Sequence, residues 1–291
     1  MPMYLKAPRI FSGHTNTIQA MDLTSDGQFL LTGGKDCSAR LWRIETGEQV
    51  KQLNLGGKWV FGIHLALDER HAVVQFFGLL WLCDLSFKYP VWTHGARFTA
   101  VGPDKRTLLT GGADYPPSLW DLITKERLVS CQPTDHKMDA AAFSPDGKRI
   151  IVNQTIWDAA TGEIALKLET QAEAGLVYRP VFSPDGTRIA GEYSYGVAGI
   201  WDASTGALLH KLEGHRYGIW DCAFSPDNRF LVTSSEDSTM RAWNVETGEH
   251  ISWFGRTQYP VTSVRFTSDG KWIVGISFME WLVWENEIAS W

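Results

Sequence analysis

The sequence feature that most constrains the fold is a unit of about 40 residues that recurs along the chain. One clear copy, residues 214–244, reads GHRYGIWDCAFSPDNRFLVTSSEDSTMRAWN. Its alternating apolar runs, separated by turns of Pro, Asn, Asp and Ser, predict three short strands. A single unit cannot bury both faces of its sheet, so the unit predicts neighbours of its own kind.

Three markers repeat in one phase. A Trp, or Cys in the second unit, ends the third run with steps of 41, 37, 37, 44, 42 and 41 residues, at Trp42, Cys83, Trp120, Trp157, Trp201, Trp243 and Trp284. A turn such as SPDG precedes the Trp by 15 residues in four units, by 14 in the last and by 10 in the fourth. TGE or TGA follows the Trp in four units, at 46–48, 161–163, 205–207 and 247–249. This spacing is close to that of a four-stranded propeller blade and predicts an all-β fold.

These markers resemble the WD-repeat β-propeller family, and the resemblance covers nearly the whole chain. It implies a single domain over residues 1–291, a seven-bladed β-propeller of four-stranded antiparallel blades. The approximate blades are residues 12–54, 55–91, 92–131, 132–168, 169–212, 213–254 and 255–291. Because the residues after Trp284 are too few for an outer strand, we expect residues 4–11 to complete the last blade and close the ring.

The resemblance also implies a hydrogen-bonded tetrad inside complete blades, from indole to hydroxyl to imidazole to carboxylate. Two units carry all four residues, namely His14, Thr32, Asp36 and Trp42, and His215, Thr233, Asp237 and Trp243. An indole only donates, a hydroxyl both accepts and donates, and imidazole offers a nitrogen on each side, so each residue type is needed. Because the indole occupies the hydroxyl, we interpret these sets as structural rather than as nucleophilic sites.

Other units depart from this pattern. The third keeps Thr110, Asp114 and Trp120 without a His in register, and the place of the turn Asp holds Phe77, Tyr195 and Phe278 in the second, fifth and seventh units. The fourth unit has lost the stretch that would hold this Asp. We therefore expect blades two, four, five and seven to be held by apolar packing.

Members of the family usually bind partners on the face formed by the loops that enter the inner strands and by the tight turns. The repeat alignment places six candidate partner-binding residues around the channel mouth on that face: Phe61, Arg97, Tyr178, Tyr217, Trp220 and Tyr259. Aromatic side chains with a polar tip are enriched in interface hot spots, and they can also hold a Lys or Arg side chain by cation–π contact. The alternative is that some of these rings only pack between inner strands.

The predicted function is a non-enzymatic scaffold that binds a protein or peptide at the channel mouth, with no catalytic residues, metal or cofactor. An enzyme or small-molecule site would need a polar centre, and the alignment offers Asp139 in the inner ring with His136 and His94 at the channel rim for a metal. No phosphate-cradling Gly-rich loop precedes a helical pattern, which disfavours a nucleotide cofactor.

Composition narrows the partner class further. A net charge of −6 with no clustered basic residues disfavours nucleic acid and anionic membranes. The four Cys are scattered without a metal-binding spacing, as expected of buried or half-buried thiols in a reducing compartment. With no signal-peptide pattern and no long apolar run, we expect a cytoplasmic protein that is monomeric unless it joins a larger complex.

Overall fold

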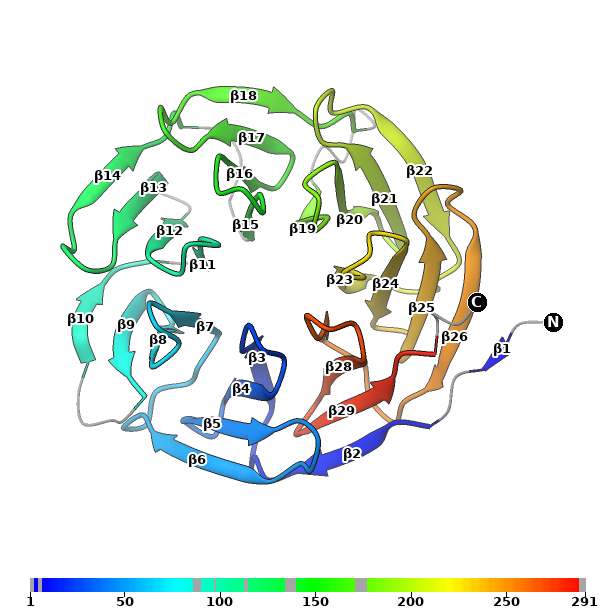
Figure 1. Cartoon of the computed structure of the whole chain (residues 1–291), viewed down its shortest axis with the longest axis horizontal. Helices are drawn as coiled ribbons and strands as arrows, with labels where there is room; N and C mark the ends of the chain where they lie inside the picture. The colour runs from blue at the N-terminus through cyan, green and yellow to red at the C-terminus, as the bar shows by residue number, and fades with distance from the viewer. Residues whose placement is uncertain are drawn as a thin grey trace.

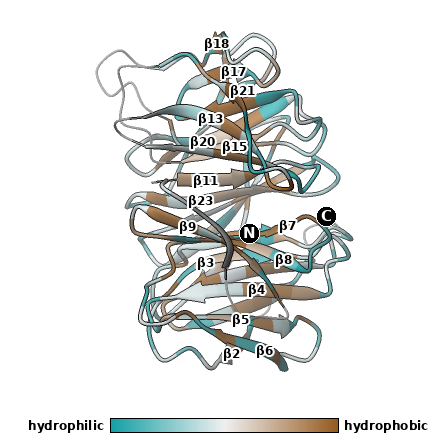
Figure 2. Cartoon of the chain, turned by 90° about the vertical axis from the view of Figure 1, so that its left-hand side faces the viewer, coloured by the Kyte–Doolittle hydropathy of each residue, from teal (hydrophilic) through white to brown (hydrophobic). Residues whose placement is uncertain are grey.

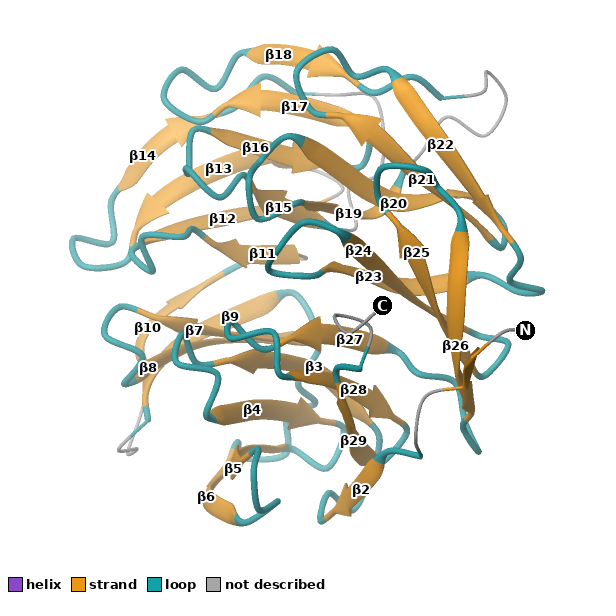
Figure 3. Ribbon diagram, turned by 45° about the vertical axis from the view of Figure 1, so that its right-hand side comes forward, coloured by secondary structure: helices purple, strands orange, loops and turns teal. Residues whose placement is uncertain are grey.

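The computed structural model describes residues 3–4, 7–85, 90–96, 98–112, 115–133, 140–170 and 177–287. Seven antiparallel sheets stand in a ring around a central channel, each with one strand at the channel and one at the rim (Figure 1). The regular elements of these residues are all strands (Figure 3). None of the described segments forms a helix that could cross a lipid bilayer. The predicted seven-bladed propeller is confirmed.

In blades one to six the strands run from inner to outer in sequence order, and in blade seven β2 from the N-terminal part of the chain is the outer strand. Blade one holds β3 (Ile18–Leu23), β4 (Phe29–Gly34), β5 (Ser38–Arg43) and β6 (Gln49–Asn54); blade two holds β7 (Gly62–Ala66), β8 (His71–Phe76), β9 (Leu79–Asp84) and β10 (Pro90–His94). Blade three holds β11 (Phe98–Val101), β12 (Thr107–Gly112), β13 (Tyr115–Asp121) and β14 (Arg127–Ser130); blade four holds β15 (Ala141–Phe143), β16 (Arg149–Val152), β17 (Thr155–Asp158) and β18 (Ile164–Lys167). Blade five holds β19 (Tyr178–Phe182), β20 (Arg188–Ser194), β21 (Val197–Asp202) and β22 (Leu208–Glu213). Blade six holds β23 (Ile219–Phe224), β24 (Phe230–Ser235), β25 (Thr239–Asn244) and β26 (His250–Arg256); blade seven holds β27 (Ser263–Phe266), β28 (Trp272–Ser277), β29 (Glu280–Glu285) and β2 (Arg9–Ser12).

The N-terminal segment closes the ring. Strand β2 pairs antiparallel with β29, from Arg9 opposite Val283 to Ser12 opposite Glu280. The ring of Phe11 stacks on Trp281 with centroids 4.4 Å apart. The closing strand is shorter than the expected residues 4–11, because a separate strand, β1 (Met3–Tyr4), pairs parallel with β26 of blade six.

Three blade boundaries differ from the sequence-based ones. The outer strand β10 continues to His94, past the expected end at residue 91, while β22 and β26 end at Glu213 and Arg256 rather than at 212 and 254. Outer strands have one exposed face and carry none of the three markers, so the repeat alignment locates them poorly. His94 therefore belongs to the outermost strand of blade two, opposite Leu80, and not to the channel rim of blade three.

Apolar side chains fill the spaces between neighbouring blades. One cluster joins blades six and seven through residues such as Phe254, Val261 and Trp284, and another joins blades one and two. Figure 2 shows hydrophobic segments along the stacked strands and hydrophilic ones in many of the connecting loops. Packing sheet on sheet around a closed ring buries both faces of each blade.

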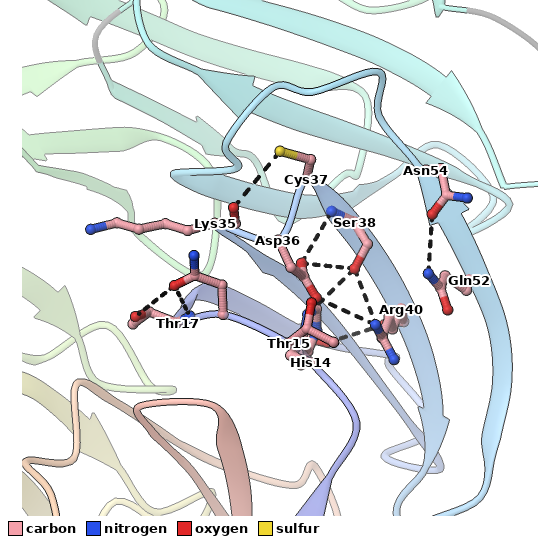
Figure 4. A network of polar contacts seen from close by, with 12 residues as sticks. His14, Thr15, Thr17, Lys35, Asp36, Cys37, Ser38, Arg40, Gln52 and Asn54 are labelled. Atoms are coloured by element: carbon pink, nitrogen blue, oxygen red, sulfur yellow. Dashed lines mark hydrogen bonds and ion pairs between the residues drawn. The ribbon is translucent and has the colours of Figure 1, made fainter.

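The tetrad of blade one is a continuous chain of hydrogen bonds. Trp42 Nε1 donates to Thr32 Oγ1 over 2.8 Å, and His14 contacts Thr32 Oγ1 through Nε2 and Asp36 Oδ2 through Nδ1, each over 2.8 Å. Asp36 also accepts from Ser38 Oγ and from an Arg40 guanidinium N–H, so its carboxylate is the hub of the network in Figure 4.

Blade six repeats this chain at 2.9, 2.8 and 3.0 Å through Trp243, Thr233, His215 and Asp237. Burial lowers the pKa of His14, which favours a neutral ring that donates from Nδ1 to Asp36. Burial alone would raise the pKa of Asp237, but hydrogen bonds from His215, Thr239 and the Arg216 amide hold it well below its ordinary value.

The marker Trp finds different partners in different blades. Trp120 in blade three donates to Thr110, whereas Trp157 and Trp201 in blades four and five donate to the carbonyl oxygens of Gln132 and Glu169. Blades four and five are therefore stabilised by these hydrogen bonds as well as by the predicted apolar packing. In blade seven the buried Nε1 of Trp284 has no hydrogen-bond partner among the described residues.

Candidate functional site

One face of the disc carries the loops that enter the inner strands and the tight turns between second and third strands. We call it the channel-mouth face. In blades two, five and seven its turns are two-residue hairpins, closed by the pairs Phe76–Leu79, Ser194–Val197 and Ser277–Glu280. In blades one and six the corresponding loops are longer and contain the tetrad Asp.

The predicted partner-binding residues on described segments reach this face. The exposed fractions of Phe61, Tyr178, Tyr217 and Tyr259 are 37%, 45%, 51% and 40%, while Trp220 is half-buried. Phe61 lines a channel cavity of about 380 Å³, and Tyr178 and Trp220 line a separate hollow of about 320 Å³ between blades four, five and six. Arg97 lies outside the described residues.

The structure adds four exposed aromatic residues to this face: Trp59, Phe77, Tyr195 and Phe278. The last three are the first residues of the two-residue hairpins, where a side chain stands at the tip of a turn. The sequence shows them at the place of the tetrad Asp, and we interpreted them only as a loss of structural support. The dipeptides Phe77-Gly78 and Tyr195-Gly196 between alternating apolar runs are hairpin signals that could have revealed these tips.

Exposed aromatic and aliphatic side chains are segregated in the described part of the chain. The exposed aromatic residues all lie at the channel-mouth face: Trp59, Phe61, Phe77, Tyr178, Tyr195, Tyr217, Tyr259 and Phe278. The exposed large aliphatic residues lie on outer strands, or in Ile123's case in a turn on the opposite face: Ile10, Val50, Ile123, Leu128, Ile164 and Leu209. Gathering of exposed aromatic surface on one face is typical of an interaction site.

Arg179 is a further site residue that the repeat alignment missed. It follows Tyr178 at an irregularity of β19 and has a left-handed backbone, with φ of 50°. Its guanidinium donates to the carbonyl oxygens of Trp220 and Thr262 and lies 5.0 Å from the Trp220 ring centroid. It thus bridges the channel-facing starts of blades five, six and seven and covers part of Trp220.

Carboxylates near the channel bind neighbouring blades. Asp221 Oδ2 accepts from Ser263 Oγ at 2.7 Å, from the Val264 amide at 3.1 Å and from Arg265 Nη1 at 2.6 Å. The Asp221 carboxylate raises the pKa of Arg265, so the Arg265 guanidinium stays charged. Asp22 similarly accepts from the Leu65 amide of blade two at 2.8 Å. These carboxylates therefore join neighbouring blades.

The structure does not describe the geometry of the alternative polar centre. His136 and Asp139 lie outside the described residues, and the backbone of His94 lies on outer strand β10 rather than at the rim as predicted. Within the described ranges, no three His, Cys, Asp or Glu side chains lie close enough together to hold a metal ion.

Comparison with known proteins adds independent findings. The family model described as "WD domain, G-beta repeat" matches residues 5–43 and 206–244. WD repeat-containing protein 82 of Drosophila melanogaster is 27% identical over 284 residues, covering 90% of this chain and 88% of that protein. Eukaryotic translation initiation factor 3 subunit I of Candida albicans is 24% identical over 282 residues, covering 88% of this chain and 70% of that protein. Protein groucho of Drosophila melanogaster is 27% identical over 193 residues, covering 62% of this chain and 26% of that protein.

The two matched segments end at Arg43 and Asn244, which are the last residues of β5 and β25. These two strands carry the tetrad Trp of blades one and six. Blades one and six are the blades with all four tetrad residues, which explains why a family model finds them and passes over the others. The ring of seven blades, the two tetrads and these relatives all indicate the same family. The chain belongs to the WD-repeat β-propeller proteins.

Proposed function

We propose that this protein is a non-enzymatic scaffold that binds a protein or peptide on its channel-mouth face. The observation that carries the proposal is the segregation of exposed side chains, with aromatic residues on that face and aliphatic residues on outer strands and the opposite side. Tyr and Trp present large contact area with few rotatable bonds and dominate the affinity of many interfaces.

The rigidity of the disc supports the same function. Aromatic residues at hairpin tips are held by paired strands on both sides, so a partner would meet a surface that is already ordered. The carboxylates described above are engaged between blades, which favours binding over acid–base chemistry. By its name, the Candida albicans relative is a subunit of a larger factor, which is consistent with a role in assembly.

A comparison of two double variants tests the proposal. Tyr217→Ala with Tyr259→Ala removes two exposed rings from the channel-mouth face, and Ile123→Ala with Leu128→Ala removes comparable apolar surface elsewhere. We avoid Trp220 because Arg179 covers it and its loss would disturb the blades. Each protein is immobilised, and the proteins retained from native lysate are compared by quantitative mass spectrometry.

We expect the Tyr217/Tyr259 variant to lose the partners of the wild-type protein, by about tenfold or more in retained amount, because hot-spot truncations have effects of this size. The Ile123/Leu128 variant should keep them, and both variants should melt close to the wild-type temperature. Retention of the same partners by the Tyr217/Tyr259 variant would show that the binding surface lies elsewhere.

A further inference from the structure

An apolar pocket opens on the channel-mouth face of blade two. It is formed by Trp59, Phe61, Phe77 and Leu79 together with Lys58 and has a volume of about 510 Å³. Its rings touch in series, with centroids 6.4 Å apart between Trp59 and Phe61 and 6.5 Å apart between Phe61 and Phe77. Phe77 is 87% exposed at the tip of its hairpin. We call this the blade-two pocket.

Two ammonium groups flank the blade-two pocket. Lys35 Nζ lies 5.4 Å from the Trp59 ring centroid, and Lys58 Nζ lies 5.2 Å from that of Trp81. In Figure 4 the side chain of Lys35 extends away from the polar network around Asp36. Exposed cation–π contacts are weak, so both ammonium groups can turn to a carboxylate without a large loss.

The described loops of blades one and two at this face carry no accessible carboxylate to balance these charges. Their acidic residue is Asp36, whose side chain is 3% exposed and is bound by His14, Ser38 and Arg40. The surroundings of the blade-two pocket are therefore apolar and positively charged, although the whole chain has a net charge of −6.

Blades five and six carry charges of both signs on the same face, since Arg179 lines the same hollow as two carboxylates. Glu192 and Glu236 line the hollow beside Tyr178 and Tyr195, and the hydroxyl of Tyr195 donates to Glu236 over 3.4 Å. The positive charge around the blade-two pocket is thus a local property and not that of the face as a whole.

We propose that the blade-two pocket binds an acidic segment of a partner protein. One large apolar side chain of that segment enters between Trp59, Phe61 and Phe77, and flanking Asp or Glu residues pair with Lys35 and Lys58. The apolar side chain supplies most of the affinity, while the carboxylates supply selectivity and speed of association. This inference rests on the proposed function, because it identifies what the channel-mouth face binds.

Selection from a phage-displayed random peptide library on the immobilised full chain tests the proposal. We expect the selected peptides to share one large apolar residue flanked by Asp or Glu. A synthetic consensus peptide is then measured by fluorescence anisotropy. Its Kd should rise about tenfold or more for Phe77→Ala and for Lys35→Glu with Lys58→Glu. It should also rise with salt, because the charged contacts are open to solvent.

A matched charge reversal serves as the control. Lys148→Glu with Lys167→Glu changes the net charge by the same amount at an exposed turn and an exposed outer strand, and should change the Kd by less than about twofold because distant exposed charges are screened. Melting curves of all variants show whether each one is folded.

Three outcomes would overturn the inference. Selected peptides that are neutral or basic, or whose Kd is unchanged by Lys35→Glu with Lys58→Glu, contradict an acidic partner. Binding that depends on Tyr217 and Tyr259 but not on Phe77 contradicts the pocket while leaving the proposed function standing. Binding that survives all of these variants contradicts both proposals.

Discussion

Replacing single tryptophans by phenylalanine can separate the hydrogen bond of the marker Trp from its packing. Trp243 and Trp284 occupy equivalent positions in blades six and seven and are 2% and 1% exposed. Trp243 Nε1 donates to Thr233 over 2.9 Å, whereas Trp284 Nε1 is buried with no partner in the described part of the chain. The register explains the difference, since Gly275 takes the place in β28 that Thr233 has in β24.

The expected difference follows from these contacts. Both changes remove the same atoms from a packed site, so the packing loss is similar and largely cancels between them. Trp243→Phe also removes a hydrogen bond with a net value of about 1 kcal/mol, while Trp284→Phe removes an unpaired buried donor whose burial costs about 1–3 kcal/mol. We therefore expect Trp243→Phe to lower the free energy of unfolding by about 2–4 kcal/mol more than Trp284→Phe does. For 291 residues this corresponds to a difference of about 3–7 °C in melting temperature.

The assay is thermal and urea unfolding of both variants, followed by circular dichroism. Trp201→Phe is the control, because its indole is fully buried and donates to Glu169 O over 2.8 Å. It should resemble Trp243→Phe. If Trp284→Phe destabilises the protein as much as the other two, the hydrogen bond is not what distinguishes these blades, and the reasoning fails.

Two further predictions concern closure of the ring and pH. Phe11→Ala removes the ring that stacks on Trp281 and should lower the free energy of unfolding by about 2 kcal/mol, measured by urea denaturation; an unchanged midpoint would mean that β2 does not close blade seven. Burial lowers the pKa of His14, His64 and His250, so below pH of about 6.5 the unfolded chain binds more protons than the folded one. Stability should therefore fall between pH of about 7.5 and about 5.5, and a urea midpoint that is equal or higher at the lower pH would contradict this.

The sequence predicts the inner part of each blade well and the outer part less well. The second and third strands and the marker Trp are largely buried, so their apolar pattern and turn residues repeat with little variation. Outer strands face solvent and tolerate many residues, which is why β10 continues to His94 and β2 begins only at Arg9. Among the described strands, the parallel strand β1 has no counterpart in the other blades, so a repeat alignment could not have predicted it.

For the site, the repeat alignment predicted positions but not the contacts between blades. Phe61, Tyr178, Tyr217 and Tyr259 are exposed at the channel-mouth face because the register of the inner strands holds. Arg179 was missed because its role depends on a left-handed backbone and on carbonyl oxygens of two other blades. Such contacts join residues far apart in the chain, and one sequence contains no signal for them.

In the turn between the second and third strands, the loss of the tetrad Asp and the gain of an exposed aromatic side chain occur at the same position. In blade six the longer turn places Asp237 beside His215, and the Asp237 carboxylate is hydrogen-bonded within the tetrad. Where a blade has no such His, an Asp in the turn would have no hydrogen-bond partner. A two-residue hairpin that exposes Tyr195 to solvent therefore costs blade five no hydrogen bond of this kind. The blades that lack the tetrad are thus free to carry exposed aromatic tips. It follows that Tyr195→Asp should not restore a tetrad, because Gly191 replaces the hydroxyl residue, but it should weaken binding at the channel-mouth face.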